Sequence, residues 1–480
     1  MLIYSGATSP LTYFYGGDSA FFILVGSGMT EGLLPYRDFF DMKGPYLFLI
    51  EFLGQKLCAG KMGIFLIQWV NLLISMIIID KIIRNHIPDI QSKSSKAIWI
   101  MEAIGIAVCL MIAAVTFEQG NLTEEFSLPV LLVCLYLALC YFERYDKEKR
   151  YEHPLAYGFV YGAAFGFLAL VRITNAALIG AILLSIVIEL LIKRKYKNLI
   201  FNGFAFLLGV LVVAAPMFAY YAAHGLLTEM LEQVFLFGVQ YSTEISLITK
   251  VVKIIRKCWN LLLLVVLPVV LLYVCCIKDR KLWTLSVSAA CAVLCATIMG
   301  NAYVHYFTLG IPNVVLAIAI VYSVGNEKLL RKQKKAVCFV GIILVVMLLP
   351  QLAWNSATGM YRSLGLSNDQ RRYQEVQIIK EAIPVGERDS IYVYGMGCSS
   401  WYARAEVYPA IRYCDWQDHY VDLVPEIGEE ILQSLEDNEI KWIVIPTNPE
   451  STEGQIWSAI MENYTIYTQT KEYTLLVANP

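Results

Sequence analysis

The chain has 480 residues, of which 58% are hydrophobic and 16% are charged. Soluble globular proteins contain about 45–50% apolar and about 25% charged residues, so an ordinary cytosolic enzyme does not fit this composition. With 38 basic and 40 acidic residues the formal net charge is −2, which excludes the positive field of a nucleic-acid-binding protein. The composition predicts a polytopic membrane protein embedded in a lipid bilayer.

Residues 1–61 contain two short apolar stretches, 19–28 and 46–57, separated by a charged turn. Both stretches fall short of the about 20 residues that a spanning helix needs, so we expect two helices at the membrane interface. The ionisable residues that begin the first stretch and occupy the turn are Asp18, Arg37, Asp38, Asp41 and Lys43. A surface turn with Asp18 as a helix N-cap is the simplest alternative explanation.

Ten longer apolar runs follow, and each predicts a membrane-spanning helix. They are residues 62–83, 97–116, 125–143, 155–171, 173–192, 199–222, 258–277, 282–299, 306–324 and 336–354. Lys and Arg concentrate in alternate connections, at 84–96, 144–150, 193–197, 278–281 and 328–335. Because basic loops stay in the cytoplasm, residues 1–61 and the C-terminal tail are predicted to lie outside it. That arrangement requires either a further helix before residue 1 or unaided translocation of the first segment, and we favour the helix.

Polar residues also occur in the outer connections between the apolar runs. They are Asn121, Glu124 and Glu125 in the loop TFEQGNLTEEF, Arg172 in VRITN, and His305 and Tyr306 in YVHY. A solvated loop, a snorkelling arginine and an interfacial histidine are the ordinary explanations for these positions. All of them lie on the same predicted side as the charged N-terminal turn, however, and ionisable groups are costly near a membrane. This arrangement favours one shared outer cavity.

The tail has an ordinary soluble composition. It contains an amphipathic helical pattern at 370–382 and three short strand patterns at 390–394, 441–445 and 472–477. We therefore expect a mainly α protein in three parts. These are an extracytoplasmic segment (1–61), a transmembrane helical bundle (62–354) and a small extracytoplasmic α/β domain (355–480).

The charged turn has a recognisable pattern. Asp18 at the head of an apolar helix, followed by G-x-x-P-Y-R-D-x-x-D-x-K-G-P, resembles the first extracytoplasmic loop of GT-C glycosyltransferases. The similarity is greatest to the group that contains protein O-mannosyltransferases and the lipid A aminoarabinose transferase. The stretches N-L-T-E-E-F, R-I-T-N and H-Y-F-x-L-x-I-P are similar to further motifs of that group.

The resemblance implies an integral-membrane enzyme with a polyprenyl-phosphate-linked sugar as donor and an active site between its outer loops. It also implies a helix before the acidic motif, in agreement with the orientation. Two positions depart from the family. Asp18-Ser19 stands where the family often has Asp-Glu, so a second acid is missing. Lys43-Gly44-Pro45 replaces the Lys-Pro-Pro of the aminoarabinose branch, which disfavours that substrate.

The resemblance implies that Asp18 is catalytic and that Lys43 contacts the lipid phosphate. Glycosyl transfer needs a group that accepts the proton of the acceptor hydroxyl, and Asp18 is our candidate. The departing phosphate needs cations, for which the candidates are Lys43, Arg172 and Arg37. Attack opposite the phosphate would invert the anomeric centre.

Further site residues are less closely defined by the pattern. Glu124 is a second catalytic candidate, and the substrate-binding candidates are Asp38, Asp41, Asn121, Glu125, His305 and Tyr306. Glu124 or Glu125 could orient the acceptor, bind the sugar, or hold a divalent cation together with Asp18. The acceptor could be a glycan, a lipid or a protein, and the bacterial plasma membrane is the expected location.

Three other functions compete with a transferase. A transporter or lipid-linked-glycan flippase would also have many spans, but its polar residues usually lie at the membrane midplane and its sequence often contains repeats, neither of which is evident here. A polysaccharide polymerase would lack the aspartate and Lys-Gly-Pro pattern. A non-catalytic relative could use the tail to bind a glycan or a partner.

Overall fold

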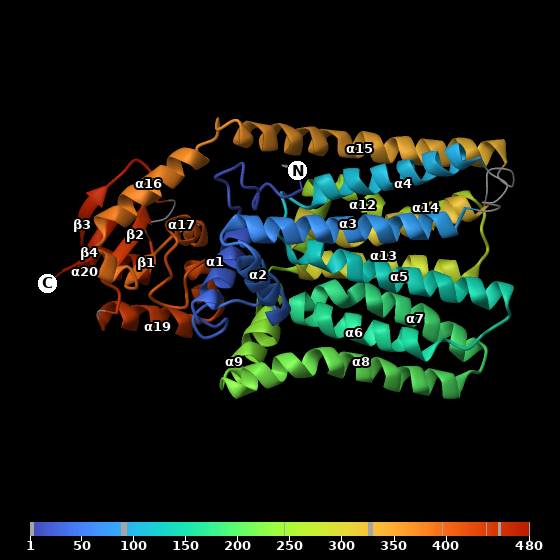
Figure 1. Cartoon of the computed structure of the whole chain (residues 1–480), viewed down its shortest axis with the longest axis horizontal. Coiled ribbons are helices and arrows are strands. Elements are labelled where there is room, and N and C mark those ends of the chain that lie inside the picture. Colours follow the sequence, from blue (N-terminus) through green and yellow to red (C-terminus); the bar gives the residue numbers. More distant parts are fainter. Residues whose placement is uncertain are drawn as a thin grey trace.

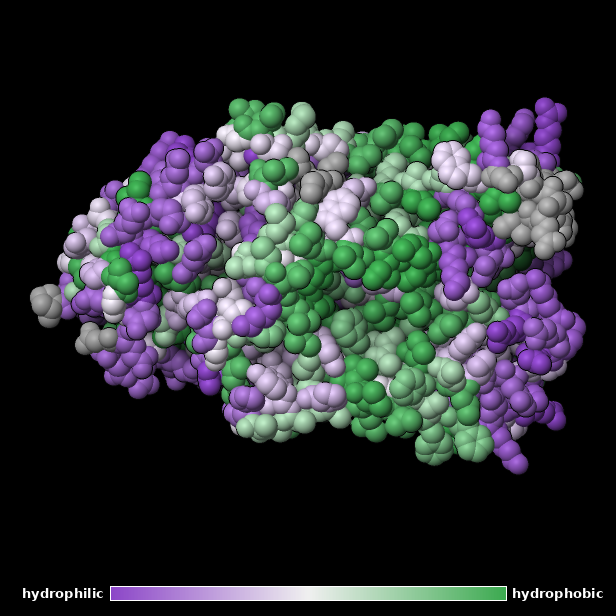
Figure 2. Space-filling model, in the orientation of Figure 1, coloured by the Kyte–Doolittle hydropathy of each residue, from purple (hydrophilic) through white to green (hydrophobic). Residues whose placement is uncertain are grey.

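The computed structural model describes residues 4–87, 94–243, 245–324, 330–395, 397–437, 439–449 and 453–479. Lys93 and Lys328, which belong to two of the basic connections, lie outside these ranges. Long helices form a bundle, and a small α/β domain covers one end of it (Figure 1). On the face that Figure 2 shows, an apolar band lies between two hydrophilic ends. The chain is an integral membrane protein.

The bundle contains the long helices. They are α3 (Lys61–Asn85), α4 (Ser95–Thr116), α5 (Thr123–Lys147), α6 (Leu155–Arg172), α7 (Ala177–Ile192), α8 (Tyr196–Ala223), α12 (Leu262–Val274), α13 (Arg280–Met299), α14 (Ile311–Val324) and α15 (Arg331–Ser363). Each of the ten predicted spans overlaps one of these helices, and the spans 173–192, 258–277 and 306–324 also include short 3-10 turns. By length and composition, the described residues contain eight membrane-crossing segments, or up to nine if a bent pair that includes α12 counts as one span.

One of these segments, Leu155–Ile192, has 38 residues and is divided near its middle. The backbone at Arg172 is extended (φ −165°, ψ 119°), and the 3-10 turn η2 (Ile173–Ala176) follows it. An ion pair of 3.0 Å between Glu152 and Lys195 joins the chain just before α6 to the chain just after α7. The two helices are therefore antiparallel (Figure 1).

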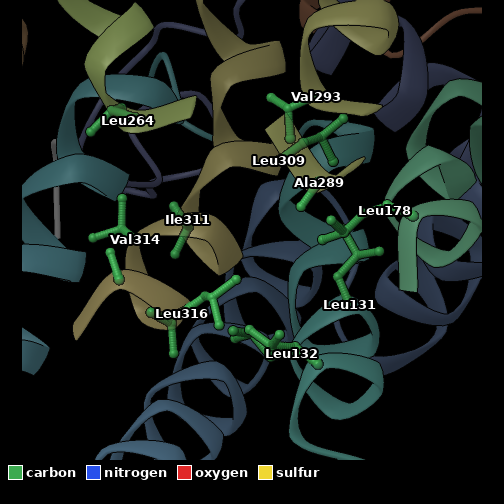
Figure 3. Packing of buried hydrophobic residues seen from close by; sticks show 14 of the residues in the cluster. Leu131, Leu132, Leu178, Leu264, Ala289, Val293, Leu309, Ile311, Val314 and Leu316 are labelled. Carbon is green, nitrogen blue, oxygen red and sulfur yellow. The ribbon is translucent and has the colours of Figure 1, made fainter. Parts of the chain in front are cut away.

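Aliphatic side chains fill the middle of the bundle. Residues from α5, α7, α13 and α14 meet there, among them Leu131, Leu178, Ala289 and Leu316 (Figure 3). On the outside, α8 packs closely on α6 because glycines replace side chains at the contact. A Cβ on Gly162 would lie 1.9 Å from the backbone oxygen of Phe206. Close packing through small residues is a common way to associate helices where lipid removes the hydrophobic driving force.

Shorter elements surround the end of the bundle that meets the α/β domain. They are α1 (Asp18–Thr30), α2 (Pro45–Leu57), α9 (Leu227–Leu231), the π-helix η3 (Glu232–Phe237), α10 (Gly238–Thr243), α11 (Leu247–Lys257), η4 (Trp259–Leu261) and η5 (Val304–Gly310). Residues Ser19–Val25 of α1 are all buried, because the helix packs between α2 and the α/β domain. This enclosure explains why α1 is apolar around its whole circumference.

The α/β domain begins after α15. Its elements are α16 (Asp369–Ala382), η6 (Val385–Glu387), β1 (Ile391–Val393), α17 (Cys398–Ala405), α18 (Gln417–Leu423), α19 (Pro425–Glu436), β2 (Trp442–Pro446), α20 (Gln455–Asn463), β3 (Tyr464–Gln469) and β4 (Tyr473–Ala478). The strand order is β1-β2-β4-β3, with β1 and β2 parallel and the other pairs antiparallel. The predicted helix and three strands correspond to α16, β1, β2 and β4, whereas β3 was not predicted.

The beginning of α2 touches the end of α6, and this contact requires glycine. A Cβ on Gly44 would lie 2.1 Å from the backbone oxygen of Leu170, and the Gly44 amide donates to the Val171 oxygen (2.9 Å). Pro45 then starts the helix, where its missing N–H costs nothing.

We expect Gly44→Ala to separate these backbones and to lower stability by about 1–3 kcal/mol, as overpacked sites do. The thermal midpoint of the purified protein measures this loss. Gly180→Ala is the matched control, since a Cβ there meets no atom within 4 Å. Equal midpoints for the two variants would show that the contact is not tight.

Candidate active site

A cavity of about 510 Å³ lies between the bundle and the α/β domain. Segments distant in the sequence contribute to its wall. The residues that carry polar or aromatic groups into it are Asp18, Asp41, Lys43, Glu118, Arg172, Tyr241, Asn301, Tyr303, His305, Tyr306, Asp415, Trp416, His419 and Tyr420. The predicted shared cavity is therefore present, and it holds six of the eleven residues that the sequence proposed.

Asp18 is the first residue of α1 and lines the cavity. Burial alone would raise the pKa of its carboxyl, but the positive charges of Lys43, His305 and Arg172 outweigh this effect and lower the pKa. Asp18 is consequently an ionised carboxylate surrounded by cations. A negative charge held among positive groups is an arrangement that can receive a proton or position a hydroxyl.

Lys43 lies on the turn before α2 and is 9% exposed. Its Nζ is 3.6 Å from Asp41 Oδ1, and its backbone N–H donates to the same oxygen (3.0 Å). Burial favours the neutral amine, but Asp41 and Asp18 raise the pKa of Lys43, so it stays charged. Burial also raises the pKa of Asp41, and Lys43 only partly offsets this.

Hydrogen bonds hold this turn in one conformation. Tyr36, whose φ is +73°, donates its hydroxyl proton to the Lys43 backbone oxygen (2.8 Å). The Gln233 amide donates to the Tyr36 oxygen (2.9 Å) and accepts from the Asp41 N–H (3.1 Å). The side chain of one residue in η3 therefore fixes both ends of the Tyr36–Asp41 segment.

Arg172 projects from the end of α6 into the cavity. Its guanidinium lies over the Tyr306 ring, 4.6 Å from the centroid, and its Nη1 is 3.9 Å from Glu124 Oε1. Glu124 is 1% exposed and does not line the cavity. Its Oε2 has no hydrogen-bond partner in the described part of the chain. Glu124 is thus placed outside the cavity wall, where it can orient the Arg172 guanidinium.

His305 lies on η5 beside Tyr306, with the two ring centroids 4.5 Å apart. Its Nδ1 is 2.7 Å from Glu118 Oε2, and its backbone N–H donates to the same oxygen (3.2 Å). The loop that carries Glu118 is not helical, since φ is positive at Glu118, Gln119 and Asn121. Glu118 and Asn121 therefore do not share a helix face with Glu125.

Asn121 and Glu125 lie beneath the cavity and not in its wall. The Glu125 carboxylate accepts from the Asn121 backbone N–H (2.8 Å) and from the Gln68 amide (2.8 Å). Asn121 in turn donates to the Ser19 hydroxyl (3.0 Å), next to Asp18 in the sequence. These two residues support the floor of the site.

Glu51 of α2 lies near Asn121 and Glu125, and its side chain is fully buried. Burial raises the pKa of Glu51 to about 8, and the nearby Glu125 contributes to this shift. No pattern in the sequence distinguishes Glu51, since it lies within an apolar stretch of normal appearance. Its carboxyl is neutral at pH 7.

The proton on the Glu51 carboxyl affects the stability of the folded protein in a measurable way. In the unfolded chain a Glu ionises near pH 4.3, whereas in the folded chain Glu51 keeps its proton up to about pH 8. Between these values the unfolded state binds fewer protons, so the free energy of unfolding falls as the pH rises. We expect Glu51→Gln to lose less thermal stability than the wild type between pH 5.5 and 8.5. Parallel curves for the two proteins would contradict this assignment.

Arg37 and Asp38 are not part of the cavity. They pair with each other (2.8 Å) at the surface, and Asp38 also accepts from the Leu34 N–H (2.6 Å). The reversal at Tyr36 turns them towards the α/β domain, near Arg412 and Glu430. The expected roles of Arg37 in phosphate binding and of Asp38 in substrate binding therefore have no support in this geometry.

The α/β domain supplies a part of the wall that the sequence did not indicate. Burial raises the pKa of Asp415 to about 7; the charge of Asp18 contributes to this shift, and a hydrogen bond from the Trp416 N–H opposes it. Trp416, His419 and Tyr420 lie beside it. The only signal in the sequence was the local density of aromatic and ionisable residues in C-D-W-Q-D-H-Y.

The suggested divalent cation lacks a set of ligands. Within the described ranges, no three His, Cys, Asp or Glu side chains are grouped closely enough to hold a metal ion. Glu124 and Glu125 lie behind the wall, so neither can share an ion with Asp18 in this arrangement. In the reaction considered for this site, the residues of this cavity act without a bound metal ion.

No family model matches the sequence, and no curated protein matches it either. The structure of ArnT from Cupriavidus metallidurans bound to undecaprenyl phosphate is similar, with a TM-score of 0.59 and 12% identity over 100% of this chain and 97% of that chain. The apo state of the same ArnT gives a TM-score of 0.53 at 13% identity, with the same coverage. The chain has the GT-C fold. The predicted fold class, a mainly α helical bundle with a small α/β domain, is confirmed.

Proposed function

We propose that this GT-C protein is a glycosyltransferase that moves a sugar from a polyprenyl-phosphate carrier to an acceptor hydroxyl. The observation that carries the proposal is the cavity in which the Asp18 carboxylate is surrounded by Lys43, Arg172 and His305. A carboxylate among cations provides both a proton acceptor and sites for a phosphate. The similar ArnT structure contains undecaprenyl phosphate, which supports a lipid phosphate as the carrier.

In the proposed reaction, the acceptor oxygen attacks the anomeric carbon and its proton passes to the Asp18 carboxylate. The bond between the anomeric carbon and the phosphate oxygen breaks, and the electron pair leaves with the lipid phosphate. Lys43 and Arg172 stabilise the negative charge that grows on this phosphate, more in the transition state than in the ground state. Attack from the face opposite the phosphate inverts the anomeric centre.

Glu124 is a positioning residue in this scheme, since it contacts Arg172 and not the cavity. Asp41 positions Lys43 in the same way, through the ion pair between the two side chains. Tyr306 supports the Arg172 guanidinium through its ring, and His305, whose ring lies 4.5 Å from that of Tyr306, adds a further donor.

Reconstituted protein given radiolabelled polyprenyl-phosphate hexose and pentose donors, together with membrane extract as the source of acceptor, tests the function. We expect labelled sugar to leave the carrier and free polyprenyl phosphate to form. Movement of intact donor between the leaflets without cleavage would indicate a flippase and would contradict the proposal.

We also propose that the cavity faces the extracytoplasmic side of a bacterial plasma membrane. The support is the concentration of Lys and Arg at the opposite end of the bundle. Cys58 is exposed at the cavity end and Cys276 is exposed at the basic end. An impermeant thiol reagent added outside intact cells should label wild type and Cys276→Ser, but not Cys58→Ser. Labelling that survives only in Cys58→Ser would reverse the orientation.

A further inference from the structure

The α/β domain contains a second cavity, of about 580 Å³. It lies where β1 and β2 end, between α16, α17 and the loop that follows β2. In open α/β sheets, the carboxyl ends of neighbouring parallel strands are the usual position of ligands. The transfer reaction proposed above uses no residue of this cavity.

Two buried donors in its wall have no partner. Trp401 is 1% exposed and Arg404 is 5% exposed, and both line the cavity. In the described part of the chain, the indole Nε1 of Trp401 and the Nε of Arg404 make no hydrogen bond. An unsatisfied buried donor costs free energy, so a ligand with acceptor oxygens would stabilise this wall.

The remaining wall combines aromatic rings with charges that are already paired. The rings of Tyr394 and Trp457 lie 6.4 Å apart and tilted by 36°. Arg372 is 3.3 Å from Glu472, and the Tyr394 hydroxyl donates to Asp418. The lining carries three basic residues (Arg372, Arg404, Lys471) and three acidic residues (Asp369, Asp418, Glu472), so it has no excess of positive charge for an anion.

This chemistry matches a neutral saccharide. Each sugar hydroxyl both donates and accepts a hydrogen bond, so it can satisfy the free indole and guanidinium protons and the lining carboxylates together. The apolar faces of sugar rings pack on aromatic side chains such as Trp457.

The second cavity is also adjacent to the first. Gly16 lines both cavities, and Asp18 follows two residues later. On α18, Asp418 lines the second cavity and the next residue, His419, lines the first. We propose that the second cavity binds a neutral saccharide portion of the acceptor and holds it beside the catalytic cavity. The role of the saccharide as part of the acceptor rests on the proposed function, whereas its binding is measured independently of sugar transfer.

Calorimetric titration of the purified full-length protein with maltotriose and with triacetylchitotriose tests the site. We expect saturable binding of at least one trisaccharide. Trp457→Ala and Arg404→Lys should each weaken it by at least about tenfold, which is about 1.4 kcal/mol. Trp401→Phe, which removes only the indole N–H, should weaken it less. Tyr467→Ala removes an aromatic ring that is 56% exposed and outside the cavity, and should leave binding unchanged.

Binding of neither trisaccharide would overturn the inference, and so would equal losses in Trp457→Ala and Tyr467→Ala. Tighter binding of glucose 1-phosphate than of both trisaccharides would show an anion site and would also overturn it. Asp18→Asn should bind the trisaccharide like the wild type. Failure of the proposed function appears only in the transfer assay, whereas failure of this inference appears only in the titration.

Discussion

Replacing Asp18 by Asn is expected to reduce sugar transfer by about 10²–10⁴-fold, the usual contribution of a general base. Asn keeps the shape of the side chain but cannot accept the proton of the acceptor hydroxyl. The nearby cations Lys43 and Arg172 remain, so the variant should still bind polyprenyl phosphate. The measurement is the initial rate of label transfer from the lipid donor, together with the apparent affinity for the donor.

Asp38→Asn is the matched control for this experiment. It makes the same chemical change at a carboxylate that pairs with Arg37 outside the cavity. Transfer by Asp38→Asn should equal that of the wild type. Equal rates for both variants would remove Asp18 from the mechanism, and a loss confined to donor affinity would make it a binding residue.

The second large effect is expected at Lys43. Lys43→Met removes a cation that faces the departing phosphate, and we expect transfer to fall by about 10²–10³-fold, as for other electrostatic transition-state contacts. The variant also leaves Asp41 buried beside Asp18 without its partner. Breaking a buried pair in this way typically costs about 3–5 kcal/mol, so the thermal midpoint should fall as well.

A double variant separates the two effects. In Lys43→Met with Asp41→Asn, the uncompensated carboxylate is gone, so stability should recover while transfer stays low. Lys56→Met is the control for the loss of a lysine, since Lys56 is exposed on α2. Recovery of transfer in the double variant would mean that Lys43 serves folding and not the departing phosphate.

Much of the fold could be predicted from the sequence because the membrane imposes simple rules. A run of about 20 apolar residues must span as a helix, and basic residues mark one side. The strand β3 was not predicted because its residues Tyr464–Gln469 are mostly exposed and follow α20 directly. Without a buried face, the strand has no clear hydrophobic alternation.

The candidate site was only partly predictable. Asp18, Lys43 and Arg172 could be grouped because each departs from its apolar surroundings on one side of the membrane. Arg37 was wrongly included because a list of charges does not show the left-handed residue Tyr36 just before it, nor that Arg37 pairs with Asp38 at the surface. Asp415 was missed because it comes from another domain, and nothing local indicates that it meets Asp18.

Residues near both ends of the chain line the same cavity. The cavity wall is therefore complete only after the C-terminal domain has been synthesised. Asp18 and Lys43 emerge early in synthesis, whereas Asp415 and His419 emerge only after the whole bundle. Until the α/β domain has folded onto α1, water can reach the carboxylate and its cations and weaken their interaction. A chain still under synthesis would therefore have an incomplete cavity wall.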